Sequence, residues 1–397
     1  MTLKHFLTFL LLALLGISCV TGAQLWTEDT SEIIRVALMQ DAEHVTLEVK
    51  DGYKIIDPPL GRVLMEGRRL ALVPAQASRN GIRIGDYDFP LAHIRIEAAK
   101  EFTLIIHNRK RRFCGSLDLI RTPTGKLLAV NRLPLESYIR GVLYHEVSHR
   151  WPLEAIKAQA VATRTYALYH KYQNGQRNFD LTNDIYSQVY GGRTSERFRT
   201  NLAVERTEGE VLMYQGQLIP AYFHATCGGH TEDVTALWNH QPLPPLKGIT
   251  CIYCQHSPHF HWKQKLDFKE IEAALRAAGF KIHSLEDIRV LDRNSSGRIK
   301  RLELMLAADQ TVKISGKDFR QAVGPNRIKS NVYQIAINGQ TVQFTGRGWG
   351  HGVGLCQWGA QKMAQRHYNY FEILQYYYPG TTIVRSIPSG RDATQRF

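Results

Sequence analysis

The spacing of hydrophobic positions divides the chain into stretches of different structure. From Ile33 to about Val130, short alternating or apolar runs such as VTLEV, RLALV, IRIEA and FTLII recur between turns rich in Gly, Pro and Asp. Alternation with a period of two predicts strands that bury one face. We therefore expect a β-rich N-terminal region, to which we assign residues 24–116.

A helical period replaces this alternation in LPLESYIRGVLYHEV, where Tyr138, Ile139 and Val142 fall on one face. Pro152 ends that helix, because the residue before a proline avoids the helical region of backbone space. A second helix follows, from about Pro152 through LEAIKAQAVATRTYALYHKY. Since this second segment is apolar around most of its circumference, we expect it to be buried.

The rest of the chain mixes short strands with helices. A Cys- and His-rich stretch leads into residues 263–325, whose helix and strands indicate a smaller inserted lobe. The last part holds the glycine-rich run GRGWGHGVGLCQWGAQKMAQ and then the helix FEILQYYY. The pattern predicts an α+β fold, in which a β-rich N-terminal region precedes a mixed α+β core over residues 117–385 with the inserted lobe, and a tail follows at 386–397.

Residues 1–23 have the pattern of a secretory signal peptide. A basic residue precedes an apolar run from Phe6 to about Ile17, which is too short for an ordinary membrane helix, and small residues follow it. Cleavage after Ala23 suits the sequence, and lipid attachment at Cys19 is the alternative. We expect export to the periplasm or the outer face of the inner membrane, with no membrane contact besides the signal peptide or this lipid anchor.

The formal net charge of +14 narrows the choice of partners. A basic exported protein prefers anionic surfaces or polymers. Nucleic acid would suit the charge, but export excludes it as the expected partner. Cell-wall glycan, teichoic acids and lipid headgroups are the anionic partners outside the membrane.

The segment VLYHEVSHRW contains His145, Glu146 and His149 in the H-E-x-x-H spacing of zinc peptidases. Such a site needs a third protein ligand. The extended form of the motif requires glycine at position 152 and histidine at position 155, where this chain has proline and alanine, and no glutamate occurs from 155 to 195. A zinc peptidase is therefore the less favoured hypothesis, and it predicts loss of activity with a chelator.

A longer block around the same glutamate resembles a known family. LPLESYIRGVLYHEVSHRWPLEAIKAQAVATRTYAL is similar to the signature block of the SpoIID/LytB family, that is, stage II sporulation protein D and its relatives. GWGHGVGLCQWGAQKMA and ILQYYYPGT resemble two further blocks of that family, in the same order. The likeness covers roughly Leu117 to Ile383, more than half of the chain.

The resemblance implies a peptidoglycan lytic transglycosylase that prefers peptide-stripped glycan strands, with remodelling at a septum or during cell division as its setting. The core over 117–385 would then be catalytic, with Glu146 as the acid and no cofactor required for catalysis. Lytic cleavage needs one carboxyl group, which protonates the glycosidic oxygen and then accepts the proton of the C6 hydroxyl as a 1,6-anhydro ring closes. The alternative is a glycan-binding protein that enhances a cell-wall amidase without cutting.

The family blocks also indicate residues for binding the glycan. IYSQVYGG resembles a block that borders the family's cleft, and the glycine-rich run offers close backbone approach to a sugar, with a tight packing turn as an equal alternative. The expected substrate-binding residues are Tyr186, Ser187, Gln188, Tyr190, Gly350, His351, Gly352, Gln357 and Arg164.

A cysteine cluster forms a separate candidate site. CIYC, from Cys251 to Cys254, has metal-ligand spacing, and Cys227 with a histidine such as His224 would complete a tetrahedral site. A structural zinc ion is one interpretation. A disulfide in an exported chain and free thiols are the others.

Overall fold

The computed structural model describes residues 32–184, 187–238 and 240–385. The predicted signal peptide, Cys19, Tyr186 and the predicted tail at 386–397 lie outside these residues. Helices make up 25% and strands 39% of the structure, which confirms the α+β prediction and its β-rich N-terminal region. None of the described helices combines the length and the apolar character needed to cross a membrane.

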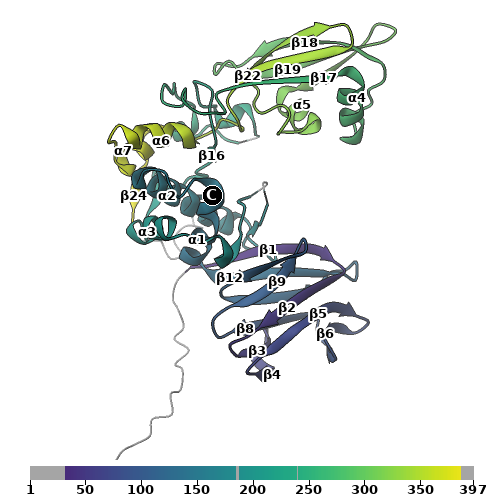
Figure 1. The fold of residues 1–397 in the computed structure, drawn as a ribbon, viewed down its shortest axis with the longest axis vertical. Helices are drawn as coiled ribbons and strands as arrows, with labels where there is room; N and C mark the ends of the chain where they lie inside the picture. Colours follow the sequence, from purple (N-terminus) through teal and green to yellow (C-terminus); the bar gives the residue numbers. More distant parts are fainter. Residues whose placement is uncertain (1–31, 185–186, 239, 386–397) are drawn as a thin grey trace, which may run out of the picture. The chain divides into compact units, whose positions relative to one another are not determined.

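Two antiparallel-rich sheets form the N-terminal region (Figure 1). They share one apolar core, to which Val45, Leu47, Ile94 and Leu117 contribute. The first sheet has the order β13 (Leu181–Thr182), β1 (Ile33–Ala42), β12 (Leu127–Pro134), β11 (Ser116–Arg121), β8 (His93–Ala98), β3 (Tyr53–Asp57), β4 (Arg62–Gly67). The second has the order β10 (Arg109–Phe113), β9 (Phe102–Ile106), β2 (His44–Val49), β5 (Leu70–Ser78), β6 (Gly81–Ile84), β7 (Tyr87–Phe89).

The first sheet runs past residue 116, where we placed the end of the β-rich region. Strand β11 pairs with β8, and β12 pairs with both β11 and β1. Since β12 ends at Pro134 and the next helix begins at Leu135, the sheet leads directly into the helical part. A sheet strand therefore fixes the start of the helix that carries the candidate acid.

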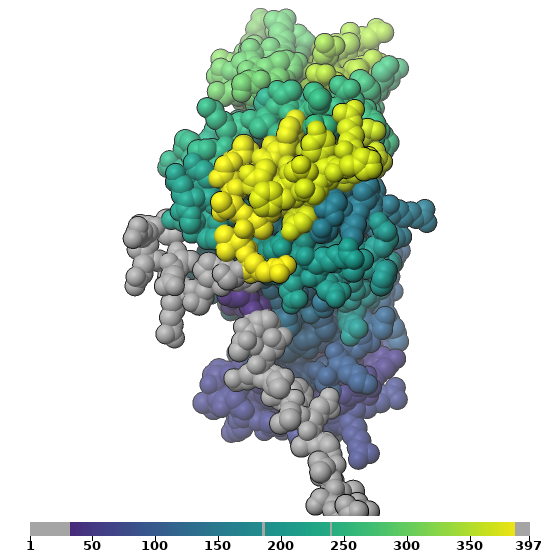
Figure 2. All heavy atoms as spheres, turned by 90° about the vertical axis from the view of Figure 1, so that its left-hand side faces the viewer, coloured from purple at the N-terminus to yellow at the C-terminus, as the bar shows by residue number. Residues whose placement is uncertain are grey.

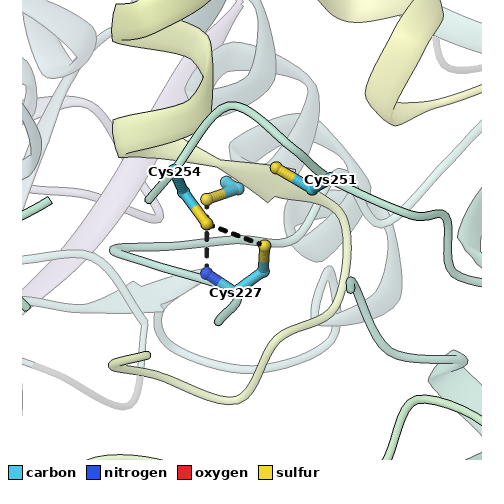
Figure 3. Close-up of side chains that lie close together, drawn as sticks. Cys227, Cys251 and Cys254 are labelled. Atoms are coloured by element: carbon cyan, nitrogen blue, oxygen red, sulfur yellow. Dashed lines mark hydrogen bonds between the residues drawn. The ribbon is translucent and has the colours of Figure 1, made fainter. Parts of the chain in front are cut away.

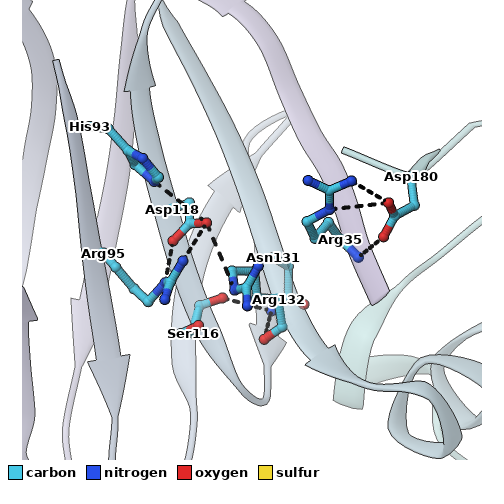
Figure 4. A network of polar contacts seen from close by, with 8 residues as sticks. All are labelled: Arg35, His93, Arg95, Ser116, Asp118, Asn131, Arg132 and Asp180. Atoms are coloured by element: carbon cyan, nitrogen blue, oxygen red, sulfur yellow. Dashed lines mark hydrogen bonds and ion pairs between the residues drawn. The ribbon is translucent and has the colours of Figure 1, made fainter. Parts of the chain in front are cut away.

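Buried acidic groups in this sheet have basic partners (Figure 4). Arg35 binds Asp180 through two side-chain nitrogens and its backbone N–H. Arg95 contacts both carboxylate oxygens of Asp118, at 2.6 and 3.2 Å. Burial alone would raise the pKa of Asp118, but His93 and Arg95 outweigh it and lower the pKa. Paired acids of this kind stay ionised and hold strands together.

The helical part surrounds one buried helix, α2 (Leu153–Gln173). Helices α1 (Leu135–Glu146), α3 (Phe198–Arg206), α6 (Gln357–Gln365) and α7 (Tyr370–Tyr377) all contact α2. The yellow atoms in Figure 2 show the C-terminal segment with α6 and α7 lying against teal atoms of the middle of the chain. The prediction that the second helix is buried is confirmed, because every residue from 158 to 168 is buried.

Short strands and 3-10 turns connect these helices. Strand β16 (Phe223–His224) pairs in parallel with β23 (Leu355–Cys356), and this pairing brings the middle of the chain beside the start of α6. The remaining elements are β14 (Val211–Tyr214), β15 (Gln217–Leu218), β24 (Thr382–Val384), η1 (Gly192–Ser195), η2 (Val234–Ala236) and η3 (Pro244–Leu246).

A further group of elements has its own apolar core, which includes Trp262, Ile271, Leu304 and Phe344. It extends beyond residues 263–325 at both ends, since β17 pairs with β22 from His261 to Arg347. Its elements are β17 (His261–Asp267), α4 (Phe268–Ala277), β18 (Leu285–Arg293), β19 (Ile299–Leu306), β20 (Gln310–Ser315), α5 (Gly316–Val323), β21 (Tyr333–Asn338) and β22 (Thr341–Arg347).

Candidate active site at the end of helix α1

Glu146 is the last residue of α1, and the packing of that helix fixes its position. Tyr138, Ile139, Val142 and Leu143 are buried on one face, as the helical period predicts. The next residue has an extended backbone, so the helix stops at the glutamate. Carbonyl groups at a helix C-terminus disfavour a negative charge there. Position alone therefore favours the neutral form of the Glu146 carboxyl.

The surroundings of this carboxyl act in the same direction. Burial raises the pKa of Glu146 to about 7, although the Gln357 amide and the backbone N–H of Val189 partly oppose that shift. The Gln357 amide donates to Glu146 Oε2 over 3.4 Å, which is a long and weak hydrogen bond. Among the residues that the structure describes, no ion pair to Glu146 forms, so no cation holds it ionised. A carboxyl group of this kind can carry its proton near neutral pH.

Three separate segments meet at Glu146: the end of α1, the start of α6 and the segment that contains Val189. Gln159 on α2 joins them, because the Gln357 amide also lies 3.4 Å from Gln159 Oε1. Gln159 and Val189 were missed by the sequence reasoning. A buried glutamine on an otherwise apolar helix is the signal that could have found the first, whereas a backbone N–H leaves no signal in the sequence.

Aromatic rings lie beside this meeting point. The charge of Glu146 contributes to the raised pKa of Tyr166, which places the two side chains near each other. Tyr166 contacts Tyr222, with ring centroids 6.0 Å apart, and Tyr222 stacks on Trp238 at 4.6 Å. His351 lies 5.3 Å from the Trp238 ring. Tyr166 is buried, whereas Tyr222, Trp238 and His351 are partly exposed. Partly exposed rings present flat apolar faces with polar edges to a ligand.

A second pair of rings belongs to Trp151 and Trp358, which lie close in the sequence to Glu146 and Gln357. Trp151, five residues after Glu146, contacts Trp358 edge-on at 5.1 Å. Trp358 directly follows Gln357 and is half-buried. Sequence reasoning placed Gln357 at the site, and the structure brings it to Glu146.

Tyr190 and Gln188 do not line an exposed surface, which corrects our expectation for both. Tyr190 is 1% exposed, and its hydroxyl donates to Asn131 Oδ1 at 2.9 Å. Its ring fills the space left by Gly141, where an added Cβ would lie 2.4 Å from the ring. Gln188 is buried and accepts a hydrogen bond from the Tyr138 hydroxyl. Tyr190 therefore packs α1 against the sheet, and Gln188 joins α1 to α2, since its amide also lies 3.5 Å from the Thr163 carbonyl.

Arg164 is a structural residue rather than a substrate ligand. Its side chain is fully buried and makes two 2.7 Å hydrogen bonds to the Glu136 carboxylate. A third nitrogen contact reaches the carbonyl of Glu210 at 3.1 Å. Ser187 also has a local role, because its Oγ accepts hydrogen bonds from the backbone and hydroxyl of Thr182. Tyr186 lies outside the described residues.

The glycine-rich run is held by tight packing within the chain. An added Cβ on Gly350 would lie 2.7 Å from His224 Cβ, and one on Gly352 would lie 2.3 Å from the Arg298 guanidinium. Both glycines have positive φ, +115° and +96°. Packing therefore explains both glycines, which was the alternative to sugar contact. Burial lowers the pKa of His351 to about 3, so its ring is neutral and accepts the Val353 N–H at 3.1 Å.

The H-E-x-x-H spacing does not form a metal site in the structure. Helix α1 ends at Glu146, so His149 lies outside the helix that would align the two rings. His145 Nε2 instead lies 2.6 Å from Ser195 Oγ. Within the described ranges, the His, Cys, Asp and Glu side chains close enough to hold a metal ion together are four cysteines.

Those four cysteines are Cys227, Cys251, Cys254 and Cys356, and all are buried. The first three are labelled in Figure 3. Sequence reasoning had named His224 as the fourth member of the group. The structure places Cys356 there, because the pairing of β23 with β16 brings it beside Cys227, whose backbone N–H contacts Cys356 Sγ. His224 Nδ1 lies 3.1 Å from the Val353 carbonyl instead.

The fold and the site together define a mixed α+β protein in which a partly buried glutamate at a helix end forms no ion pair with any described residue. A family model described as stage II sporulation protein matches residues 123–214, which include this glutamate. A second model, described as a domain of unknown function (DUF8618), matches residues 251–354. With the similarities below, these matches show that the chain belongs to the stage II sporulation protein D (SpoIID) family, which is associated with cell-wall lytic activity.

The chain is similar to relatives over most of its length. An uncharacterised protein of Brachyspira hyodysenteriae is 34% identical over 89% of this chain and 93% of the relative. Stage II sporulation protein D of Bacillus subtilis is 30% identical over 64% of this chain and 76% of the relative. The amidase enhancer of the same organism is 29% identical over 62% of this chain, but only 40% of that relative is covered.

Proposed function

We propose that this protein is a lytic transglycosylase of peptidoglycan, with Glu146 as both acid and base. The observation that supports this most strongly is the state of the Glu146 carboxyl, whose pKa burial raises to about 7 with no charged partner among the described residues. Such a group holds a proton at neutral pH and can give it to a leaving oxygen.

The reaction needs only this one carboxyl. Glu146 protonates the glycosidic oxygen between N-acetylmuramic acid and N-acetylglucosamine, and the bond from C1 of the muramic acid to that oxygen breaks. The C6 hydroxyl oxygen of the same muramic acid bonds to C1 and closes the 1,6-anhydro ring. The hydroxyl proton passes to the Glu146 carboxylate, which restores the starting acid. Atoms balance without water entering, whereas hydrolysis normally uses a second carboxylate as base or nucleophile.

Neighbouring groups support both protonation states in turn. The Gln357 amide and the Val189 N–H favour the carboxylate that forms after the first proton transfer. The partly exposed rings of Tyr222, Trp238 and Trp358 offer apolar faces for the glycan strand. The net charge of +14 suits an anionic wall polymer, and the predicted export would bring the protein to it.

Purified protein incubated with amidase-stripped glycan strands and with intact peptidoglycan tests the proposal. We expect anhydro-muramyl ends from the wild type and none above background from Glu146→Gln. Glu205→Gln is the matched control, because Glu205 is an exposed residue of α3. Cleavage by Glu146→Gln at the wild-type rate would contradict the role of this residue.

A second candidate function rests on the similarity to the amidase enhancer of Bacillus subtilis. A protein of this kind would bind glycan strands and stimulate a cell-wall amidase without cutting. The same preparations, mixed with a purified cell-wall amidase, separate the two candidates. Stimulation that Glu146→Gln retains, together with no anhydro ends from the wild type, would favour the enhancer.

A further inference from the structure

The four buried cysteines come from three parts of the chain and converge on one point. Cys227 follows β16, Cys251 and Cys254 lie in the C-x-x-C loop, and Cys356 is the last residue of β23. Their Sγ atoms all lie within 4.8 Å of one another, and those of Cys227 and Cys254 are 3.4 Å apart. Figure 3 shows the sulfurs of Cys227, Cys251 and Cys254 directed toward one another.

These separations suit one tetrahedral ion. With a zinc–sulfur bond of about 2.3 Å, tetrahedral geometry places ligand sulfurs about 3.8 Å apart. The 3.4 Å separation of Cys227 and Cys254 and the 4.8 Å limit on all the separations form a range that includes that value. Sites with four thiolate ligands bind zinc or an iron–sulfur cluster. The sulfur separations here match a single central ion.

Hydrogen-bond donors surround the sulfurs, as thiolate ligands require. The Tyr377 hydroxyl lies 3.2 Å from Cys251 Sγ, and the backbone N–H of Cys227 donates to Cys356 Sγ at 3.3 Å. The backbone N–H of Gly228 donates to Cys254. A cluster of neutral thiols would have little use for so many donors.

A buried cation lies beside the same group. Arg298 is 1% exposed, and its guanidinium donates to the carbonyl oxygens of Cys227 at 2.7 Å and His230 at 2.9 Å. Its Nε has no hydrogen-bond partner among the described residues. One zinc ion with four thiolates carries a net charge of −2, which a neighbouring buried guanidinium partly offsets.

We propose that Cys227, Cys251, Cys254 and Cys356 bind one structural zinc ion that fixes the start of α6. The site is closed, since four protein ligands leave no open position for substrate. Cys356 immediately precedes Gln357, the first residue of α6, whose amide contacts Glu146. The ion therefore ties the C-x-x-C loop to the residue beside the candidate acid. Zinc binding does not depend on the proposed activity. Only the claim that the ion helps to position Gln357 beside a catalytic Glu146 rests on that activity.

Metal content measured on protein purified without added metal tests the site directly. We expect about one zinc ion per wild-type chain. Cys356→Ser should lose most of the bound zinc, whereas His224→Gln and Cys114→Ser should retain it. Cys114 is the matched control because it is a half-buried cysteine outside the group. Zinc retained by Cys356→Ser, or lost by His224→Gln, would contradict the ligand set.

Wild-type protein alone provides a second test, in case Cys356→Ser does not fold. Replacement of zinc by cobalt should give the strong thiolate-to-cobalt absorption of a tetrahedral four-sulfur site. Alkylation followed by mass spectrometry should show the four thiols protected until a chelator is added, with a lower melting temperature after chelation. Metal-free protein in which these cysteines form disulfide-linked peptides would overturn the proposal. Neither readout uses glycan cleavage, so failure here is distinct from failure of the proposed activity.

Discussion

The two ends of helix α1 carry glutamates with opposite surroundings. At the start, Glu136 makes two 2.7 Å hydrogen bonds to the buried Arg164, and its Oε1 also accepts the Gly209 N–H. At the end, Glu146 has a weak contact to an amide, a backbone N–H and no basic partner among the described residues. One residue type in one helix is thus placed in two different electrostatic environments.

This difference shows that the partner of a buried acid decides what the acid does. A buried carboxylate paired with arginine is ionised, and removing either partner leaves an uncompensated buried charge. A carboxyl group without a cation reduces the cost of burial by keeping its proton. Helix polarity adds to both effects, because the N-terminus favours a negative charge and the C-terminus disfavours it. Glu136 therefore holds the fold together, and Glu146 is available for proton transfer.

The largest expected effect is a fall in the rate of glycan cleavage in the Glu146→Gln variant. Glutamine keeps the size of the side chain but has no proton to transfer. Since general acid–base catalysis contributes about 10²- to 10⁴-fold, the rate of anhydro-end formation should fall by at least about 100-fold. The measurement is the initial rate on stripped strands. A rate within threefold of wild type, with native circular dichroism, would remove Glu146 from the mechanism.

At the start of α1, a substitution of Glu136 should change the stability of the fold. Glu136→Gln leaves the Arg164 charge buried and unpaired, so unfolding should become easier by about 3–5 kcal/mol. Urea denaturation at pH 7 measures this change. The double variant Glu136→Leu/Arg164→Met serves as control and should recover most of the loss, because it removes both charges. Equal destabilisation by Glu146→Gln would contradict the contrast between the two ends.

The pH dependence of cleavage should show the proton that Glu146 carries. Because the pKa of Glu146 is raised to about 7, the group is protonated below that value and loses its proton above it. The value of kcat/KM on stripped strands should therefore fall above pH 7, about tenfold per pH unit. Two results would show that the titrating proton belongs to another group. One is a fall in kcat/KM at the same pH in Glu146→Asp as in the wild type. The other is a wild-type kcat/KM that rises through pH 8.

The free energy of unfolding should depend on the same Glu146 proton, and it can be measured without substrate. The folded state binds the Glu146 proton more tightly than the unfolded chain, so the wild type loses stability between pH 4.5, the ordinary value, and about pH 7. The full difference corresponds to an upper limit of about 3 kcal/mol. Glu146→Gln should therefore be more stable than wild type at pH 8 and equal to it near pH 4. Equal stability at both pH values would contradict the raised pKa.

The smallest expected effect concerns the amide beside the acid. The Gln357 amide lowers the pKa of Glu146, so Gln357→Met should move the basic limb of the pH profile to higher pH by less than one pH unit. Gln361→Met is the control, since Gln361 lies on the same helix as Gln357 but its side chain contacts His256. An unchanged limb in Gln357→Met would mean that the long 3.4 Å contact has no effect on the proton.

Sequence reasoning located the candidate acid but not its surroundings. The helical period located α1, but Pro152 predicted an end just before residue 152, whereas the helix ends at Glu146. The family blocks favoured Glu146 over the neighbouring histidines. The same blocks misled us for Arg164 and Tyr190, because a block shared by a family does not distinguish a buried packing residue from an exposed ligand. Cys356 was missed as the fourth sulfur, since it lies 129 positions after Cys227 and the pairing of β16 with β23 brings these two segments together.

The most direct test of the proposed chemistry asks whether water enters the product. Stripped glycan strands are digested by the wild type in water enriched in a heavy oxygen isotope, and the new muramyl ends are weighed by mass spectrometry. A single acid without a second carboxylate predicts ends lighter by one water molecule and free of the heavy isotope. Ends that contain one heavy oxygen would show hydrolysis and would contradict a mechanism carried by Glu146 alone.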